Sequence, residues 1–118
     1  MATRARIGYV KEDGTIETSY NHWDGYPSAL GKTLQEHWTD TDKLAPSVAK
    51  GYSSDWGIDE ESIVRNNPND ATLISNSKQE LMQSGFRWGE EYIYVLDNDE
   101  WTVYERNGFY YQLADHLD

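Results

Sequence analysis

Two short glycine turns, one near each end of the chain, constrain the fold more than any other feature. Asp13-Gly14 and Asn107-Gly108 each lie between two runs of β-prone residues. Glycine accepts the positive φ that tight hairpin turns require, so each dipeptide predicts a β-hairpin. A further run, 92–96, is apolar on both faces, which is typical of a covered central strand. We therefore predict an antiparallel sheet of about five strands, built from an N-terminal hairpin and a C-terminal meander.

Helical patterns lie between these two regions. Apolar residues recur every four positions and predict a helix over 28–38. A second helix is predicted over 41–50, with Gly51 as its C-terminal stop. Pro46 lies past its first turn and is expected to kink it or divide it into two short turns. We expect both helices to pack on one face of the sheet, which gives a single α+β domain over 1–118.

The stretch 52–89 shows little regular pattern. Residues 66–70 have the composition of a turn. A brief strand is predicted at 72–74, and a short helix at 78–83 with Ser77 as its cap. A segment this long with so few elements predicts an excursion over one face of the molecule, or a mobile region.

Charge and composition exclude several classes of protein. The 118 residues carry 21 acidic and 10 basic side chains, so the net charge is −11, which argues against direct binding to nucleic acid or anionic membranes. The absence of cysteine excludes disulfides, thiolate metal sites and cysteine nucleophiles. No apolar run approaches the roughly 20 residues of a membrane helix. The basic residues at the N-terminus precede no apolar stretch, so no secretion signal is expected.

Most of the negative charge lies in the second half. Residues 51–118 hold fourteen acidic and four basic residues, or −10. One interpretation is a solvated surface that favours solubility; the other is a docking surface for a basic partner. The strands of this half are also rich in aromatic residues, which either pack in the sheet or form part of that contact surface. The candidate partner-binding residues are Glu90, Glu91, Asp97, Asp99, Glu100, Trp101, Tyr104 and Tyr110.

A short aromatic loop over 22–27 is the candidate ligand site. Its candidate binding residues are His22, Trp23, Asp24, Gly25 and Tyr26. The two rings suit stacking on a base, the imidazole and carboxylate suit hydrogen bonding, and a helix N-terminus favours an anion, so a nucleotide-like ligand is predicted. The other interpretation is a core turn, in which the two aromatic rings anchor the loop and the aspartate caps backbone donors.

Metal binding and catalysis lack a sequence motif. A metal site would need His22, Asp24, Glu36 and His37 to meet, and no histidine pair has zinc-ligand spacing. No phosphate loop or nucleophile elbow is present. We therefore predict no catalytic residues, metal or cofactor, and favour a binding protein over an enzyme.

The segment 2–8, the Asp13-Gly14 turn, the His-Trp-Asp-Gly-Tyr-Pro loop and Gly51-Tyr52-Ser53-Ser54 together resemble a known group. It consists of small uncharacterised proteins encoded by tailed bacteriophages and prophages. Members often carry a cysteine before the histidine, where this chain has Asn21. The resemblance implies a phage accessory protein in the host cell cytoplasm, and no particular chemistry.

Together these observations predict a non-enzymatic protein that binds a host or defence protein through its acidic, aromatic C-terminal half. The alternative is a protein that binds or sequesters a small nucleotide-like ligand with the 22–27 loop. Self-association is compatible with either, because exposed aromatic strands are typical of protein contacts.

Overall fold

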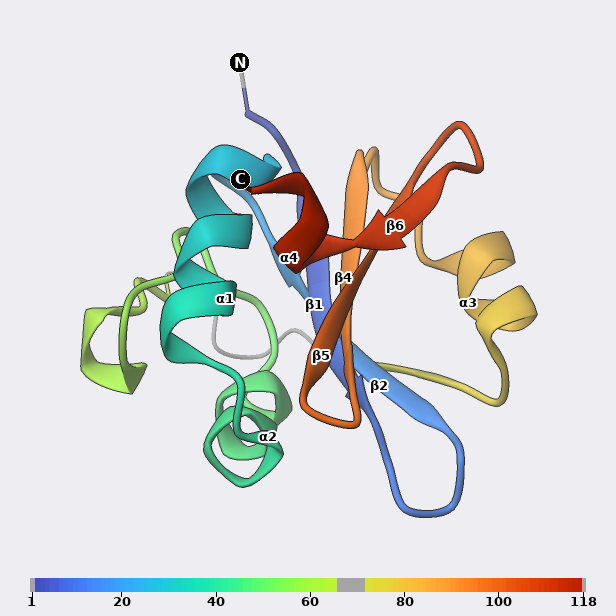
Figure 1. Cartoon of the computed structure of the whole chain (residues 1–118), viewed down its shortest axis with the longest axis horizontal. Helices are drawn as coiled ribbons and strands as arrows, with labels where there is room; N and C mark the ends of the chain where they lie inside the picture. Colours follow the sequence, from blue (N-terminus) through green and yellow to red (C-terminus); the bar gives the residue numbers. More distant parts are fainter. Residues whose placement is uncertain (1, 66–71, 118) are drawn as a thin grey trace.

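The computed structural model describes residues 2–65 and 72–117. Its centre is one six-stranded sheet in the order β3-β2-β1-β4-β5-β6 (Figure 1). The strands are β1 Ala5–Val10, β2 Ile16–Asn21, β3 Leu73–Ser75, β4 Tyr92–Asp97, β5 Glu100–Glu105 and β6 Tyr110–Gln112.

The predicted hairpins are present at both ends of the chain. β1 and β2 are antiparallel and joined by a turn in which Gly14 has φ 88°. β5 and β6 are antiparallel and joined through Gly108, at φ 99°. Between β4 and β5 the turn consists of Asn98 and Asp99, which both have positive φ, 51° and 65°. This pair of left-handed residues is the backbone of a tight two-residue hairpin turn.

The sheet is mixed, so the prediction of an antiparallel sheet of about five strands is only roughly right. β1 and β4 run parallel, with Ala5 opposite Tyr92 and Tyr9 opposite Leu96. β3 pairs with β2 and adds the sixth strand. A parallel pair needs a long crossover between its strands, and here the helices and the 51–89 region provide it. Because β1 and β4 are far apart in the sequence, no local residue pattern predicts that they pair.

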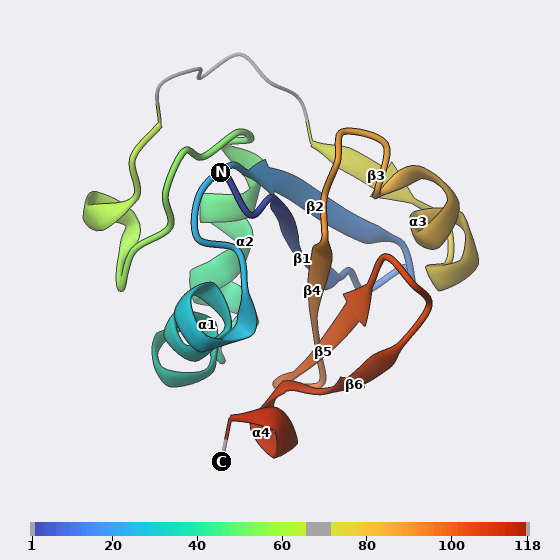
Figure 2. The same ribbon diagram turned by 90° about the horizontal axis from the view of Figure 1, so that it is seen from above.

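The two helices predicted to share one face of the sheet do so, and a third helix, for which no face was predicted, covers the opposite face. η1 and α1 with α2 lie on one side, and α3 lies on the other (Figure 2). The bounds are η1 Pro27–Gly31, α1 Lys32–His37, α2 Thr41–Ala49, η2 Glu60–Ser62, α3 Lys78–Ser84 and α4 Leu113–His116. α3 takes this side because Leu81 packs with Ile93 and Val95, which alternate with the β4 residues on the opposite face.

The local helix signals are largely confirmed. The predicted helix over 28–38 is present as a π-helical turn, η1, followed directly by α1. α2 continues through Pro46 as one helix, so the predicted division is wrong. The side chain of Ser77 accepts a hydrogen bond from the Glu80 N–H and caps α3, as expected. The turn predicted at 66–70 lies outside the described residues.

Two hydrophobic clusters hold the layers together. The larger lies between the sheet and α1 and α2, and includes Leu34, Trp38, Tyr94 and Trp101. Trp101 Nε1 donates to the carbonyl of Trp38 at 3.0 Å, which satisfies a buried donor. The smaller lies beneath α3. In the described part of the chain, no helix has both the length and the apolar character needed to cross a membrane.

Candidate functional site

The loop that follows β2 is fixed by backbone hydrogen bonds on two sides. The His22 N–H donates to the Ser53 carbonyl at 3.0 Å, and the Trp23 N–H donates to the Ser54 carbonyl at 2.9 Å. On the other side the Gly25 N–H donates to the Thr3 carbonyl at 2.9 Å. The loop therefore lies between the start of the chain and the segment that follows α2.

Gly25 occupies a position with no room for a side chain. A Cβ atom there would lie 2.7 Å from the Thr3 carbonyl oxygen and 2.8 Å from the Ala5 Cβ. Its own carbonyl accepts a hydrogen bond from the buried Tyr94 hydroxyl at 2.7 Å. Burial raises the pKa of Tyr94, so this hydroxyl stays protonated as a donor. Gly25 is a packing residue rather than the ligand contact that we predicted.

A cavity of about 210 Å³ opens beside this loop. It is lined by Trp23, Asp24, Ala29, Leu30, Thr33, Asp55 and Trp56. Asp24 takes a left-handed backbone conformation, at φ 57°, and its carbonyl accepts from the Leu30 N–H at 3.2 Å. The first turn of the following helix thus forms one wall of the cavity.

The predicted loop residues divide into two groups. Trp23 and Asp24 line the cavity, and Trp23 is 46 % exposed, so it is not a core anchor. His22 and Tyr26 are not among the lining residues. The His22 Nδ1 lies 2.8 Å from the Tyr20 hydroxyl, and its ring meets the Trp23 ring edge-on at 4.8 Å between centroids. His22 therefore packs against the Trp23 ring without lining the cavity itself.

Two residues of the cavity, Asp55 and Trp56, were missed by sequence reasoning. They lie in a stretch with the composition of a turn, and they reach the loop because this stretch pairs with Asn21–Trp23. One signal in the sequence indicates them. Trp23-Asp24 and Asp55-Trp56 both place a carboxylate directly beside an indole.

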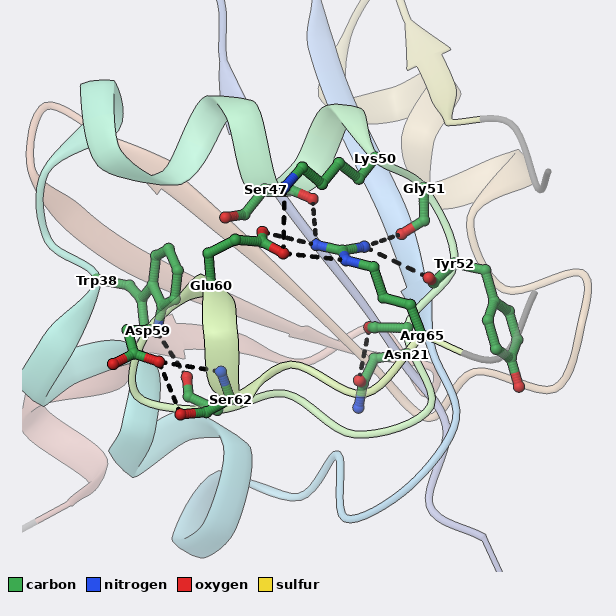
Figure 3. Close-up of polar contacts among 12 residues, drawn as sticks. Asn21, Trp38, Ser47, Lys50, Gly51, Tyr52, Asp59, Glu60, Ser62 and Arg65 are labelled. Atoms are coloured by element: carbon green, nitrogen blue, oxygen red, sulfur yellow. Dashed lines mark hydrogen bonds and ion pairs between the residues drawn. The ribbon is translucent and has the colours of Figure 1, made fainter. Parts of the chain in front are cut away.

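Arg65 fixes the segment that carries Asp55 and Trp56. Figure 3 shows its guanidinium between the Glu60 carboxylate and three carbonyl groups at the end of α2. Its Nη2 donates to Ser47 at 2.8 Å, and its Nη1 donates to Gly51 at 3.1 Å and to Tyr52 at 3.4 Å. The Ser47 carbonyl belongs to the last turn of α2, where a helix leaves its carbonyls unpaired, and the other two follow the helix.

Further bonds close the same segment. The Val64 N–H donates to the Asp55 carbonyl at 2.9 Å, and the Trp38 Nε1 donates to the Gly57 carbonyl at 2.8 Å. The Trp56 ring lies 5.3 Å from the Trp38 ring, between centroids. The second wall of the cavity is therefore anchored in the larger hydrophobic cluster.

The cavity is electrostatically negative. Burial raises the pKa of Asp55, the neighbouring Asp24 carboxylate raises it further, and the Trp56 backbone N–H opposes both effects. None of the lining residues is basic. Two like charges in one cavity disfavour each other, so a bound cation would relieve the repulsion.

Trp56 contributes a second polar feature to the wall. Its side chain is 8 % exposed, and its Nε1 has no hydrogen-bond partner among the described residues. Buried donors in native proteins are nearly always paired. Trp56 thus carries a buried donor with no partner among the described residues.

The candidate residues of the C-terminal half do not form one surface. Trp101 and Tyr104 are buried in the two hydrophobic clusters, because alternation along β5 sends one into each face of the sheet. Glu90 is also buried, where its carboxylate accepts from Arg6 Nε at 2.9 Å and from the Trp88 N–H at 2.7 Å. The predictions of partner contact for Trp101 and Glu90 are therefore wrong, whereas Tyr104, at 8 % exposed, also lines a groove beside α3.

The remaining candidates lie in two places. Asp97, Asp99 and Glu100 surround the β4–β5 turn, where Asp97 is half-buried and the other two are exposed. Glu91 precedes β4 at its opposite end, and the exposed Tyr110 pairs with Tyr104 in β6. The acidic turn and the aromatic strand are therefore separate features.

Within the described residues, no group of three or more histidine, aspartate or glutamate side chains is arranged to hold a metal ion. The hypothetical set of His22, Asp24, Glu36 and His37 thus does not form such a group there. The donor atoms of the cavity are two carboxylates and a threonine hydroxyl, which suit an organic cation that also contacts the indoles.

Comparison of the chain with protein-family models, curated proteins and solved structures finds no match.

Proposed function

We propose that the protein binds a partner protein with a basic surface, and that the cavity takes a Lys or Arg side chain of that partner. The observation that carries the proposal is that Asp24 and Asp55 share a cavity with Trp23 and Trp56 and with no basic residue. The partner is a host or defence protein if the chain acts in the phage context that its sequence resembles.

The chemistry of the walls matches a cationic side chain. A cation over the face of the exposed Trp23 gains about 0.5–2 kcal/mol, depending on its desolvation, whereas the Trp56 ring already has the Arg65 guanidinium 5.8 Å from its centroid. Two carboxylates add charge-assisted hydrogen bonds to an ammonium or guanidinium group.

The size of the cavity supports a side chain rather than a whole small molecule. Its volume of about 210 Å³ is below the roughly 300–1,000 Å³ typical of sites for drug-sized ligands. Its charge also disfavours the nucleotide-like ligand, since a phosphate would approach two carboxylates. The site is therefore better suited to one protruding basic residue.

A second candidate surface for the same partner chemistry lies at the β4–β5 turn. Asp99, Glu100 and Asp115 line a hollow of about 350 Å³ together with Gln35 and Gln112, and no basic residue is among its lining. Two residues of this hollow, Asp99 and Glu100, belong to the docking surface that the sequence predicts for the C-terminal half. It lacks the aromatic walls of the first cavity apart from the buried Trp101.

Titration with an acetylated tetra-arginine peptide tests the proposal, with tetra-glutamate as the control peptide. We expect the arginine peptide to change the tryptophan fluorescence. Asp55→Asn should weaken its binding about tenfold, which corresponds to about 1.4 kcal/mol. Glu36→Gln is the matched control, because Glu36 is an exposed carboxylate on α1 outside the cavity.

The variants also separate the two surfaces. If the double variant Asp99→Asn with Glu100→Gln loses binding of the arginine peptide and Asp55→Asn does not, the peptide binds at the β4–β5 turn and not in the cavity. Equal weakening by Asp55→Asn and Glu36→Gln would show that the peptide responds only to net charge, and would reject both sites.

A further inference from the structure

A second groove lies between α3 and the β5–β6 hairpin, on the sheet face opposite α1 and α2. Figure 1 shows the hairpin rising on the side of the sheet where α3 lies. The groove has a volume of about 430 Å³, and its walls include Lys78, Met82, Phe86, Tyr104, Arg106 and Tyr110. Apolar and aromatic side chains thus form most of this surface.

The aromatic side chains at the hairpin are largely solvent-exposed. Phe109 is 70 % and Tyr110 73 % exposed, the highest values among the large apolar residues. Tyr110 stacks on Tyr104, with 6.1 Å between ring centroids. Exposed aromatic residues beside a groove are typical of an interaction surface.

The groove borders a free edge of the sheet. β6 is the last strand of the sheet, and among residues 2–65 and 72–117 it pairs only with β5. The Glu105 N–H donates to the Phe109 carbonyl at 2.8 Å, so Phe109 faces β5. The N–H and C=O groups of successive residues point alternately to the two sides of a strand. The N–H and C=O of Tyr110 and the N–H of Gln112 therefore point away from β5, toward the open edge of the sheet. An unpaired edge of this kind accepts an added strand.

The charge of the groove is opposite to that of the molecule. Lys78 and Arg106 line it, and neither forms an ion pair with a carboxylate among the described residues. Arg106 instead donates to the carbonyls of Phe86 and Glu90. The third charged residue, Glu105, accepts from the Tyr111 hydroxyl at 2.8 Å. In a chain of net charge −11, this local excess of positive charge selects an acidic occupant.

We propose that the groove and the β6 edge bind an extended segment of a partner protein that carries apolar residues and a carboxylate. The segment adds as a strand beside β6 and packs apolar side chains against Tyr110 and Phe86. Its carboxylate pairs with Lys78 and Arg106. This surface is independent of the basic partner proposed above, because its ligand has the opposite charge and occupies the opposite face.

A pair of blocked peptides tests the proposal. The first, Thr-Leu-Thr-Leu-Thr-Glu-Thr, places leucine and glutamate on one face of a strand, and the second has lysine in place of glutamate. We expect the glutamate peptide to bind at least about tenfold more tightly, as followed by amide shifts of Tyr110 and Gln112. Overall electrostatics of a −11 protein predict the reverse order, so equal or tighter binding of the lysine peptide overturns the proposal.

Variants of the chain test the two contributions separately. Lys78→Gln should remove most of the preference for the glutamate peptide, because Lys78 is exposed on α3 and lines the groove. Gln112→Pro should abolish binding of both peptides. Gln112 has φ −75°, which proline adopts, so the change removes the outward N–H without strain. Thermal melting checks that the variant is folded.

A change in the ligand tests strand addition without altering the protein. The glutamate peptide with N-methyl groups on alternate amides should lose binding, because it no longer donates to the β6 edge. Unchanged binding of this peptide overturns strand addition. Dodecanoate that displaces the glutamate peptide from the unmodified chain and still binds to Gln112→Pro also overturns it, in favour of a lipid-type site. If the protein forms a dimer that the peptide does not dissociate, the β6 edge pairs with a second copy of the chain, and this result also overturns the proposal. Asp55→Asn should leave binding of the glutamate peptide unchanged.

Discussion

Asp55 lies beside Asp24, and burial together with this second negative charge raises the pKa of Asp55. A carboxyl whose pKa is higher in the folded state than in the unfolded state destabilises the fold when it is ionised. This loss of stability is absent at a pH below the pKa that Asp55 has in the unfolded state. It is complete at a pH above the raised pKa that Asp55 has in the folded state. Neutral pH therefore leaves Asp55 in its unfavourable form.

We predict that Asp55→Asn raises the free energy of unfolding at pH 7 by up to about 0.5 kcal/mol, the range of surface substitutions. The gain should vanish near pH 3, where Asp55 is protonated in both states. Urea unfolding at the two pH values measures it. A destabilised variant at pH 7 would mean that the carboxylate makes a favourable contact instead. The residue would then keep its charge for stability rather than for binding.

Arg6 and Glu90 form a buried ion pair, with side chains 7 % and 1 % exposed. Burial lowers the pKa of Arg6, and the nearby Glu90 charge opposes this effect. Removal of one member of such a pair leaves an uncompensated charge and costs about 3–5 kcal/mol. We predict a loss of this size for Glu90→Gln in urea denaturation.

The double variant Arg6→Met with Glu90→Met distinguishes charge from packing. Replacement of a whole buried pair by apolar residues is often neutral, so most of the stability should return. If the double variant is as unstable as Glu90→Gln, the bonds of Arg6 to Thr18 and of Glu90 to the Trp88 N–H account for the loss instead.

Glu90 also shows the limit of sequence reasoning at this scale. Glu90 and Glu91 are identical neighbours, yet one is buried and the other is exposed. Only the position of Arg6, which is 84 residues away in sequence, decides between them. Trp23 and Asp24, by contrast, lie at the surface, as expected for a turn between a strand and a helix, and both line the cavity.

At the level of elements, the β4–β5 turn is a place where the sequence is not optimal for its backbone. Asn98 and Asp99 both have positive φ, and Asn-Gly is the dipeptide that this turn prefers. We predict that Asp99→Gly raises the thermal midpoint by stabilising the fold about 0.5 kcal/mol, since glycine adopts this conformation without strain. Asp13→Gly is a suitable comparison at another turn. It should destabilise, because Asp13 Oδ1 accepts from the Thr15 N–H and hydroxyl.

The elements predicted well are those encoded by neighbouring residues. Turn glycines determine the two terminal hairpins, and the Ser77 cap determines the start of α3. α3 covers the side of the sheet on which Ile93 and Val95 of β4 lie. The sequence predicts that β4 has apolar residues on both faces, but it does not indicate which of the two faces α3 covers. Pro46 lies on the exposed side of α2, so water can hydrate the Asp42 carbonyl that the proline leaves without a helical partner.

At the level of the whole molecule, the net charge of −11 repels itself in the compact state. Salt screens this repulsion, with a Debye length of about 10 Å at 0.1 M. We predict that the melting temperature at pH 7 rises by several degrees between about 0.01 and 0.5 M NaCl. The rise should be smaller near pH 4, where carboxylates are being protonated. A fall in the melting temperature with salt would mean that the ion pairs outweigh the repulsion.

The adjacent parallel strands β1 and β4 set an order of events during synthesis on the ribosome. β1 emerges early and finds β2 at once, but its other neighbour is translated more than eighty residues later. Until then the nascent hairpin presents an open edge at β1, even though η1, α1 and α2 are translated first and can cover one of its faces. Chaperone binding to this intermediate should therefore end only when Tyr92–Asp97 leaves the exit tunnel, and a slow codon placed before that point would prolong the vulnerable interval.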